Sequence, residues 1–388
     1  MDETIIRVLF ALLRSGMQGR PLTDAEKRLY KPEQLPAIYR LSKAHDIAHL
    51  IGLALERNGL SGAPEFEEKF QKKQFIAVLR YEQLNYVQNQ MFAALEAAQI
   101  PFLPLKGTVI RSLYPEGWMR TSCDVDVLVR PEHLEQAMVC LEQSCGYVRR
   151  GKGSHDVNLL TPDRQHVELH YTLMEDEHAG AQVLKYVWDH ATPVEGWQYR
   201  QEIPDDLFYY YHIAHMAKHF ELGGCGIRPL IDLWLLDKQD RDSQKRDLLL
   251  AQGGLLQFAN AARRLSVCWM ENGEADGLSR QMEQFILFGG VYGTRENLVK
   301  VHQVKKGSKG RYALSRIVLP YDVLKFQYPV LEEHRWLLPV CQVRRWCRLV
   351  FGGRLKSSIR ELSINQDIKE DQADETKRFL QELGLLQA

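Results

Sequence analysis

The chain has 388 residues, of which 45% are apolar and 26% are charged, proportions that are ordinary for a globular protein. Fifty Lys and Arg residues balance fifty Asp and Glu residues, so no overall field favours nucleic acid, and we expect no DNA partner. A chain of this length can hold two or three domains and bury a sizeable core.

The sequence predicts a cytoplasmic protein. Its acidic start, Met1-Asp-Glu-Thr, lacks the basic segment and the cleavage site of a signal peptide. No apolar run approaches the length of a membrane span, so we expect no membrane contact. Seven scattered cysteines with no Cys-x-x-Cys pair suit a reducing compartment and match no zinc motif.

An N-terminal helical region is predicted over residues 1–95. Apolar residues recur at helical spacing near the start and again through Leu35–Asn58, which is predicted as one helical stretch. Glu65–Gln99 follows as a long amphipathic helix. We expect these helices to pack on the core, and they carry no residues that suggest chemistry.

An αβ core is predicted over residues 96–175, and it begins with a strand and a glycine turn. The apolar strand Ile100–Leu105 runs into Lys106-Gly107-Thr108, and a short helix follows to Leu113. Glycine in such a turn lets the backbone approach a ligand closely, and the start of the next helix favours phosphate. The turn is therefore a candidate phosphate site.

Two carboxylates follow on one strand. Cys123–Val129 alternates, so Asp124 and Asp126 project from the same face. Two carboxylates on one face repel each other unless a cation or a proton lies between them. Mg²⁺ takes such oxygen ligands together with substrate phosphates. Asp-x-Asp by itself is common without a metal, so the pattern gains weight only from its surroundings.

A third carboxylate lies on a second alternating strand, His166–His170. Glu168 and His170 share a face of this strand. Placed beside the Asp pair, Glu168 would complete a two-metal site for in-line phosphoryl or nucleotidyl transfer. The glycine turn ahead of the Asp pair and this strand behind it favour metal binding over an isolated Asp-x-Asp.

Between these strands we expect a helix and then a hairpin. Its two strands are Tyr147–Arg150 and Ser154–Leu160, around a turn at Gly151–Gly153. Lys152 and His155 on this hairpin could reach a triphosphate or an acceptor. An exposed hairpin lysine, however, is more often only solvated.

A C-terminal helical domain is predicted over residues 176–388. Its helix Asp205–Phe220 carries His212, His215 and His219 on one face. A zinc site is one interpretation, but the sequence places no fourth ligand. A buried cluster of structural histidines is another.

Arg228 and Asp232 follow a glycine-rich turn and lie one helical turn apart. Because their charges are opposite, one interpretation is that they pair and lock two helices together. The other interpretation gives them a role at the active-site cleft.

Residues 295–360 are basic, with fifteen Lys and Arg against four Asp and Glu. Gly307 and Gly310 lie among lysines and predict an exposed loop, and three arginines share a predicted helix with Trp346. Such a segment could steer a polyanionic acceptor such as RNA, although a solvated helix face is the commoner explanation. The acidic tail from Glu361 is expected to close against it.

The order of these motifs resembles the nucleotidyltransferases of the DNA polymerase β superfamily, and more narrowly the bacterial "uncharacterised nucleotidyltransferase" group. The resemblance covers roughly Glu82 to Leu236 and rests on Leu-Lys-Gly-Thr, Tyr-Pro, Asp-x-Asp and Val-Glu-Leu-His in that order. The group also tends to carry His-x-x-Lys-His and Arg-x-Leu-x-Asp-Leu, which this chain has from His215 and Arg228. One departure is Gly107-Thr108, where the superfamily usually has Gly-Gly or Gly-Ser.

The resemblance implies an α+β fold. A polymerase β-like core, with a mixed sheet and flanking helices, would be embedded between N-terminal and C-terminal helical regions. It also implies an enzyme that moves an NMP, with AMP the first expectation, from an NTP to a hydroxyl or phosphate of an acceptor and releases pyrophosphate. The expected cofactor is Mg²⁺ or Mn²⁺.

The resemblance gives the three carboxylates the central role. Asp124, Asp126 and Glu168 would be both the catalytic residues and the metal ligands, and His170 would assist or orient Glu168. In this interpretation the metal stabilises the transferring phosphate and lowers the pKa of the acceptor hydroxyl.

The same resemblance assigns the phosphate contacts. Gly107 and Thr108 would cradle the β and γ phosphates, and Lys106 or Arg120 would neutralise the leaving pyrophosphate. The residues expected to face the cleft and touch phosphate or acceptor are His215, Lys218 and His219.

Several alternatives stay open. The acceptor could be a small molecule, a peptide or protein, or RNA, and the sequence determines neither the acceptor, nor the base, nor the oligomeric state. A non-catalytic nucleotide- or partner-binding protein, antitoxin-like, is the alternative of a different class. Kinase or hydrolase chemistry is disfavoured because the chain has no Walker-type lysine motif and no nucleophile elbow.

Overall fold

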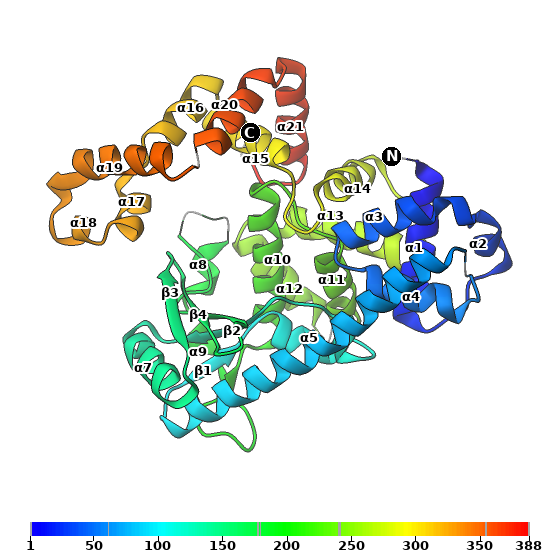
Figure 1. Ribbon diagram of the computed structural model, residues 1–388, viewed down its shortest axis with the longest axis horizontal. Coiled ribbons are helices and arrows are strands. Elements are labelled where there is room, and N and C mark those ends of the chain that lie inside the picture. The colour runs from blue at the N-terminus through cyan, green and yellow to red at the C-terminus, as the bar shows by residue number, and fades with distance from the viewer. Residues whose placement is uncertain are drawn as a thin grey trace.

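The computed structural model describes residues 2–60, 62–176, 178, 180–239, 242–353 and 355–386. Within these residues the fold is α+β, as predicted, with a five-stranded mixed sheet set among many helices (Figure 1). No helix in this part of the chain is long and apolar enough to cross a membrane.

Five helices precede the sheet. They are α1 (Glu3–Gln18), α2 (Asp24–Leu29), α3 (Leu35–Ala44), α4 (Ala48–Arg57) and α5 (Pro64–Ala97). The long helix predicted before the core is confirmed as α5. The single helical stretch predicted over Leu35–Asn58 is wrong, because Asp46 has a φ of +55°. This left-handed conformation interrupts a right-handed helix and separates α3 from α4.

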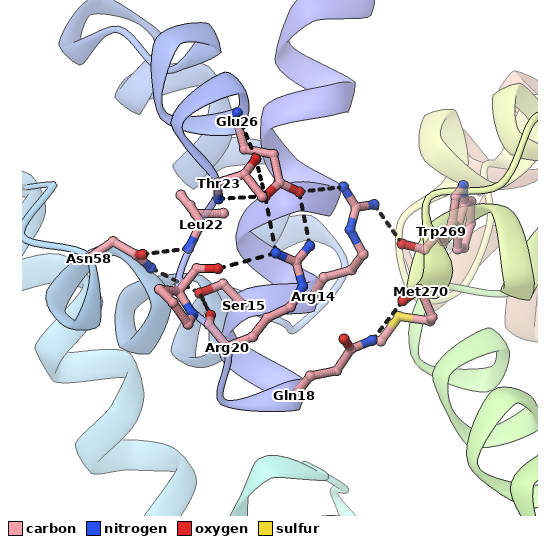
Figure 2. A network of polar contacts seen from close by, with 11 residues as sticks. Arg14, Ser15, Gln18, Arg20, Leu22, Thr23, Glu26, Asn58, Trp269 and Met270 are labelled. Carbon is pink, nitrogen blue, oxygen red and sulfur yellow. Dashed lines mark hydrogen bonds and ion pairs between the residues drawn. The ribbon is translucent and has the colours of Figure 1, made fainter.

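The N-terminal helices are attached to a helix from the second half of the chain (Figure 2). The buried side chain of Arg14 donates to the carbonyl of Trp269 at 2.9 Å, and Gln18 donates to the carbonyl of Met270 at 2.6 Å. Both carbonyls belong to α13 (Leu256–Glu271). Buried side chains of α1 and α13 therefore share one hydrophobic core.

The sheet has the strand order β1-β2-β5-β4-β3. Its strands are β1 (Phe102–Pro104), β2 (Asp124–Val129), β3 (Val148–Lys152), β4 (Asp156–Leu160) and β5 (His166–His170). Strands β2 and β5 run parallel, whereas the other neighbouring pairs are antiparallel. The turn predicted at Gly151–Gly153 is wrong in part, because Gly151 and Lys152 belong to β3, where a bulge follows Arg149.

Successive side chains of β2 point to opposite faces of the sheet, and only one of these faces is packed against α5 and α7 (Leu134–Cys145). The three valines of β2 pack against these helices in one apolar core. Because successive strand residues point to opposite faces, Asp124 and Asp126 lie on the other face. Leu128 of that face joins the core that also contains α10 (Asp205–Glu221).

Between the sheet and α10 the chain forms short elements. These are α8 (Ala181–Leu184), α9 (Val187–His190), β6 (Thr192–Pro193) and β7 (Gln201–Glu202). The helices that follow α10 and enclose the core are α11 (Arg228–Lys238), α12 (Ser243–Gln252), α13 and α14 (Gly277–Gly289).

The basic segment forms an arm that projects from the body of the protein, with α17 to α19 at its far end (Figure 1). The arm helices are α15 (Arg295–Lys306), α16 (Lys309–Ile317), α17 (Tyr321–Gln327), α18 (Val330–Glu333), α19 (Leu338–Phe351) and α20 (Leu355–Asp367), followed by α21 (Glu370–Glu382). The exposed loop predicted around Gly307 and Gly310 is confirmed at Gly307 and Ser308, which are exposed, and wrong at Gly310. Gly307, with a φ of +76°, makes a tight turn between α15 and α16, and Gly310 is helical.

Candidate active site

The parallel pairing of β2 with β5 brings two carboxylates together. Asp126 lies directly opposite Glu168 in the register, so both side chains project from the same face. Asp124 is two residues earlier on that face. The side chain of Asp126 is 4% exposed and that of Glu168 is 27% exposed, so Glu168 is the more accessible of the opposed pair.

The ammonium of Lys106 lies between these carboxylates. Its Nζ is 2.9 Å from Oδ1 of Asp126 and 3.7 Å from Oε2 of Glu168. Lys106 reaches this position from the turn after β1, where its φ is +39°. Burial opposes a charge here, but the two carboxylates raise the pKa of Lys106 above its usual value. Lys106 therefore remains an ammonium and compensates the charge of the pair.

His170 supports the same two carboxylates from below the surface. It is 1% exposed, and its Nε2 lies 3.1 Å from Asp126 and 3.3 Å from Glu168. Burial and Lys106 lower its pKa, but the hydrogen bonds to the two carboxylates outweigh them and raise it. This geometry suits the predicted role of orienting Glu168.

The three carboxylates together carry more negative charge than their neighbours neutralise. Burial, Asp126 and Glu168 raise the pKa of Asp124 to about 6. Asp126 differs, because Lys106 and His170 outweigh its burial and hold its pKa well below the usual range. An additional cation is thus favoured beside Asp124.

A group of donor atoms at this site could hold a metal ion. Ligand atoms of Asp126, Glu168 and His170 lie within 4.8 Å of one another, and Asp124 projects from the same face. Carboxylate oxygens are the ligands that Mg²⁺ and Mn²⁺ prefer. The group that could hold a metal ion is therefore Asp126, Glu168 and His170, whereas Asp124, predicted as a ligand, lies on the same strand face but is not part of this group.

The predicted glycine turn is packed closely. α6 (Gly107–Ile110) starts at Gly107 and continues as a 3₁₀ turn over Arg111–Leu113. A Cβ added to Gly107 would lie 2.7 Å from Nη1 of Arg120, so a side chain at this position would displace the guanidinium. The backbone N–H of Thr108 donates to the carbonyl of Leu105 at 3.1 Å, so this N–H already has an acceptor within the turn.

Arg120 is engaged in a buried ion pair. Its Nε and Nη2 donate to the carboxylate of Asp232 at 2.9 and 2.7 Å, and the hydroxyl of Tyr114 donates to the same carboxylate at 2.7 Å. The pairing of Arg228 with Asp232, one of the two sequence interpretations, is wrong. Arg228 instead donates to the carbonyl of Thr121 at 2.6 Å. A phosphate contact by Arg120 stays a prediction.

The histidine-bearing helix α10 faces the carboxylates. His215 and His219 lie 3.3 Å apart through their Nε2 atoms. Burial is the main cause that lowers the pKa of His219 to about 4, so its ring is neutral. His212 hydrogen-bonds the carbonyl of Pro229 at 3.0 Å. The three histidines do not converge on one point, and the zinc interpretation loses its geometric basis.

A cavity of about 850 Å³ joins most of the predicted site residues. Of these, the residues that line it are Lys106, Gly107, Arg120, Asp124, Asp126, Glu168, His215, Lys218 and His219. Thr108 and His170 are not in its lining; His170 lies behind the carboxylates.

The comparison with known families bears on this arrangement. The model of a family described as "uncharacterised nucleotidyltransferase" matches residues 31–271, more than half of the chain. The chain belongs to this family. The match spans every strand of the five-stranded sheet and all of α10, so the matched residues include the carboxylates, the glycine turn and the histidine-bearing helix of this chain. A search of curated proteins and a search of solved structures each found no match.

Within the family match, sequence reasoning missed Glu175. Its carboxylate lies 2.8 Å from Nδ1 of His155 and 2.7 Å from Nζ of Lys218. These two partners outweigh the effect of burial and lower the pKa of Glu175. The ring of His155 lies 5.5 Å from that of His170. Glu175 follows β5 in irregular backbone, where no periodicity marks a functional residue.

Sequence reasoning also missed a wall of the cavity, and only one of its two segments lies outside the family match. Residues 287–293 line the cavity, as do residues 43–46 from the end of α3. Neither segment carries a catalytic motif. Their proximity to Asp124 depends on how the helices pack.

Proposed function

We propose that this protein is a nucleotidyltransferase with a polymerase β-like core that depends on Mg²⁺ or Mn²⁺. It would move an NMP, with AMP as the first candidate, from an NTP to a hydroxyl or phosphate of an acceptor and release pyrophosphate. The family assignment supports nucleotidyl transfer in general. The observation that carries the proposal is the in-register opposition of Asp126 and Glu168, with Asp124 on the same face of a shared cavity.

In this proposal Asp124, Asp126 and Glu168 hold the metal, and His170 keeps Glu168 in place. A metal bound there would stabilise charge on the phosphates and lower the pKa of the acceptor hydroxyl. The acceptor oxygen forms a bond to the α-phosphorus of the NTP, and the bond from that phosphorus to the pyrophosphate oxygen breaks.

Lys106 is the residue best placed to serve the phosphates. Its flexible side chain carries a charge that the opposed carboxylates stabilise. When a bound cation neutralises these carboxylates, the Lys106 side chain can instead contact a phosphate oxygen in the same cavity. Lys218 and the neutral imidazoles of His215 and His219 offer further contacts to phosphate or acceptor.

The test is thermal unfolding of the wild type and of an Asp124→Asn/Asp126→Asn double variant. Each NTP is added with and without Mg²⁺. Ligand at about a hundred times its dissociation constant adds about 2.7 kcal/mol to stability, a shift of a few degrees. A Mg²⁺-dependent shift with an NTP, absent in the double variant, supports the proposal and names the nucleotide.

One observation favours the alternative, a non-catalytic nucleotide- or partner-binding protein. Lys106 already compensates the Asp126–Glu168 pair, and a lysine fixed there would exclude a metal. In that case no NTP would give a Mg²⁺-dependent shift, and Lys106→Met would lower stability without uncovering metal binding.

The acceptor is a small molecule, a peptide or protein, or RNA. An RNA acceptor would use the basic arm, because charges on residues 295–360 favour a polyanion. Transfer to RNA would then fall steeply as salt rises, whereas transfer to a neutral small molecule would not.

A further inference from the structure

The segment 287–293, Leu-Phe-Gly-Gly-Val-Tyr-Gly, brings two aromatic rings to the active-site cavity. All seven residues line the cavity that holds the three carboxylates. The segment comprises the last residues of α14 and the start of the connection to α15, and it lies beyond residue 271, where the family match ends. It is therefore a part of the site that the family assignment does not describe.

The backbone of this segment is held firmly. The N–H of Val291 donates to the carbonyl of Ala44 at 3.0 Å, and His45 bonds the carbonyl of Leu287 at 3.3 Å. Gly290 has a φ of +64°, and a Cβ there would lie 2.9 Å from the oxygen of Ala44. Gly293 has a φ of +73°, and a Cβ there would collide with the carbonyl of Gly223. These glycines allow the close packing that fixes the segment against the body of the protein.

The two aromatic side chains of the segment are, by contrast, uncovered. Phe288 is 60% exposed and Tyr292 is 76% exposed. Among the residues that the structure describes, neither ring packs on another aromatic ring, and the hydroxyl of Tyr292 makes no hydrogen bond. Both residues line the polar cavity, and Phe288 also lines a second cavity beside α1 and α13. A fixed backbone that presents uncovered aromatic rings at the edge of a polar cavity is suited to a flat, apolar ligand surface.

We propose that Phe288 and Tyr292 form the subsite that stacks on the nucleobase of the NTP. This inference rests on the proposed function, which supplies a ligand with both a polyphosphate and a flat heterocycle. The polyphosphate would bind at Lys106 and the carboxylates, and the base would stack on Phe288 and Tyr292 at the same cavity. A cavity of about 850 Å³ has room for both parts.

The composition of the segment also bears on base choice. Apart from the two rings it contains glycine, valine and leucine, so the Tyr292 hydroxyl is its only side-chain hydrogen-bonding group. Every base has a face that can stack, and stacking on aromatic side chains tolerates any sequence. The subsite therefore contributes affinity for a base rather than discrimination between bases.

The experiment compares ligands with and without a base. Wild type, Phe288→Ala and Tyr292→Ala are titrated calorimetrically with ATP, GTP, CTP and UTP, and with tripolyphosphate, all in excess Mg²⁺. The wild type should bind at least one NTP more tightly than tripolyphosphate. Each alanine variant should weaken that NTP by about tenfold, within the range for loss of one base–aromatic stack, and leave tripolyphosphate binding unchanged.

Two controls separate stacking from damage to the fold. Tyr292→Phe should keep the affinity of the wild type, because it retains the ring. Tyr86→Ala removes a ring that is 66% exposed on α5, outside the cavity, and should change neither ligand.

The outcomes distinguish this inference from the proposed function. Three outcomes would overturn the stacking subsite and leave the proposed donor site intact. The wild type could bind NTP and tripolyphosphate with equal affinity, or both alanine variants could bind NTP as the wild type does. The alanine variants could also lose affinity for NTP and tripolyphosphate equally. Failure of the wild type to bind any NTP or tripolyphosphate would overturn the proposed function, and the subsite with it.

Discussion

The guanidinium of Arg120 and the carboxylate of Asp232 form two hydrogen bonds, at 2.9 and 2.7 Å, between the segment before β2 and helix α11. Both side chains are buried, with exposures of 7% and 1%. The residues are 112 positions apart. The pair ties the strand that bears Asp124 and Asp126 to the helices that close the cavity.

Replacing Asp232 with Ala should cost about 3–5 kcal/mol of unfolding free energy, because it leaves the Arg120 charge buried without its partner. Denaturant unfolding measures the loss. Arg149→Gln is the matched control, since Arg149 pairs with Glu135 and Glu142 at an exposed site and should cost about 1 kcal/mol or less. A loss for Asp232→Ala no larger than that of the control would contradict the tie between sheet and helices.

Asp126→Asn should abolish nearly all nucleotidyl transfer. Losing a metal ligand removes several kcal/mol of transition-state stabilisation. The variant should also be less stable than the wild type, because Lys106 and His170 lose the carboxylate that they contact. Transfer of label from an α-labelled NTP measures activity, and retention of more than about a tenth of it would remove Asp126 from the proposed site.

Asp124→Asn should have the opposite effect on stability. The pKa of Asp124 is about 6 in the folded protein, above the 3.8 of a free side chain, so ionisation of Asp124 favours unfolding. This cost is small below pH 4, grows as the pH rises from 4 to 6, and is complete above pH 6. The metal-free variant should therefore be more stable than the wild type by about 2–3 kcal/mol at pH 7.5 and equally stable at pH 4.

Unfolding of both proteins in urea with a chelator tests this difference. A destabilised Asp124→Asn protein at pH 7.5 would show that the carboxylate has a stabilising partner after all. Nucleotidyl transfer should still be lost in this variant, so stability and activity move in opposite directions.

We expect the stability of the folded protein to fall at acidic pH because of His45. This histidine is fully buried, donates to the carbonyl of Leu287, and burial lowers its pKa to about 4 from 6.5. Because the folded pKa lies below the unfolded one, the stability that neutral His45 provides is complete above pH 6.5. It is lost as the pH falls toward 4, by about 3 kcal/mol.

His45→Gln keeps a donor but cannot titrate, so its unfolding free energy should fall less between pH 6.5 and 4 than that of the wild type. Other buried histidines with lowered pKa values, such as His49 and His212, titrate in both proteins and cancel in the comparison. Parallel pH profiles for the two proteins would show that His45 remains neutral or has a partner in both states.

Local sequence patterns predicted those features that depend on local periodicity. The alternation of β2 and β5 placed Asp124 with Asp126 and Glu168 with His170, since a strand has a period of two whatever surrounds it. Helical spacing likewise predicted α5 and α10. The patterns were misleading where the backbone conformation of one residue interrupts a helix. The apolar spacing continues through Asp46, but the left-handed backbone of this residue separates α3 from α4.

The sequence by itself thus determined the three carboxylates, the glycine turn and the family, because each is encoded in a short run of neighbouring residues. Only the tertiary structure decided that Asp232 pairs with Arg120 rather than with Arg228, and that Glu175 joins His155 to Lys218. It alone placed Phe288 and Tyr292 at the cavity. These relationships join residues far apart in the chain, and burial and packing, rather than local spacing, select such partners.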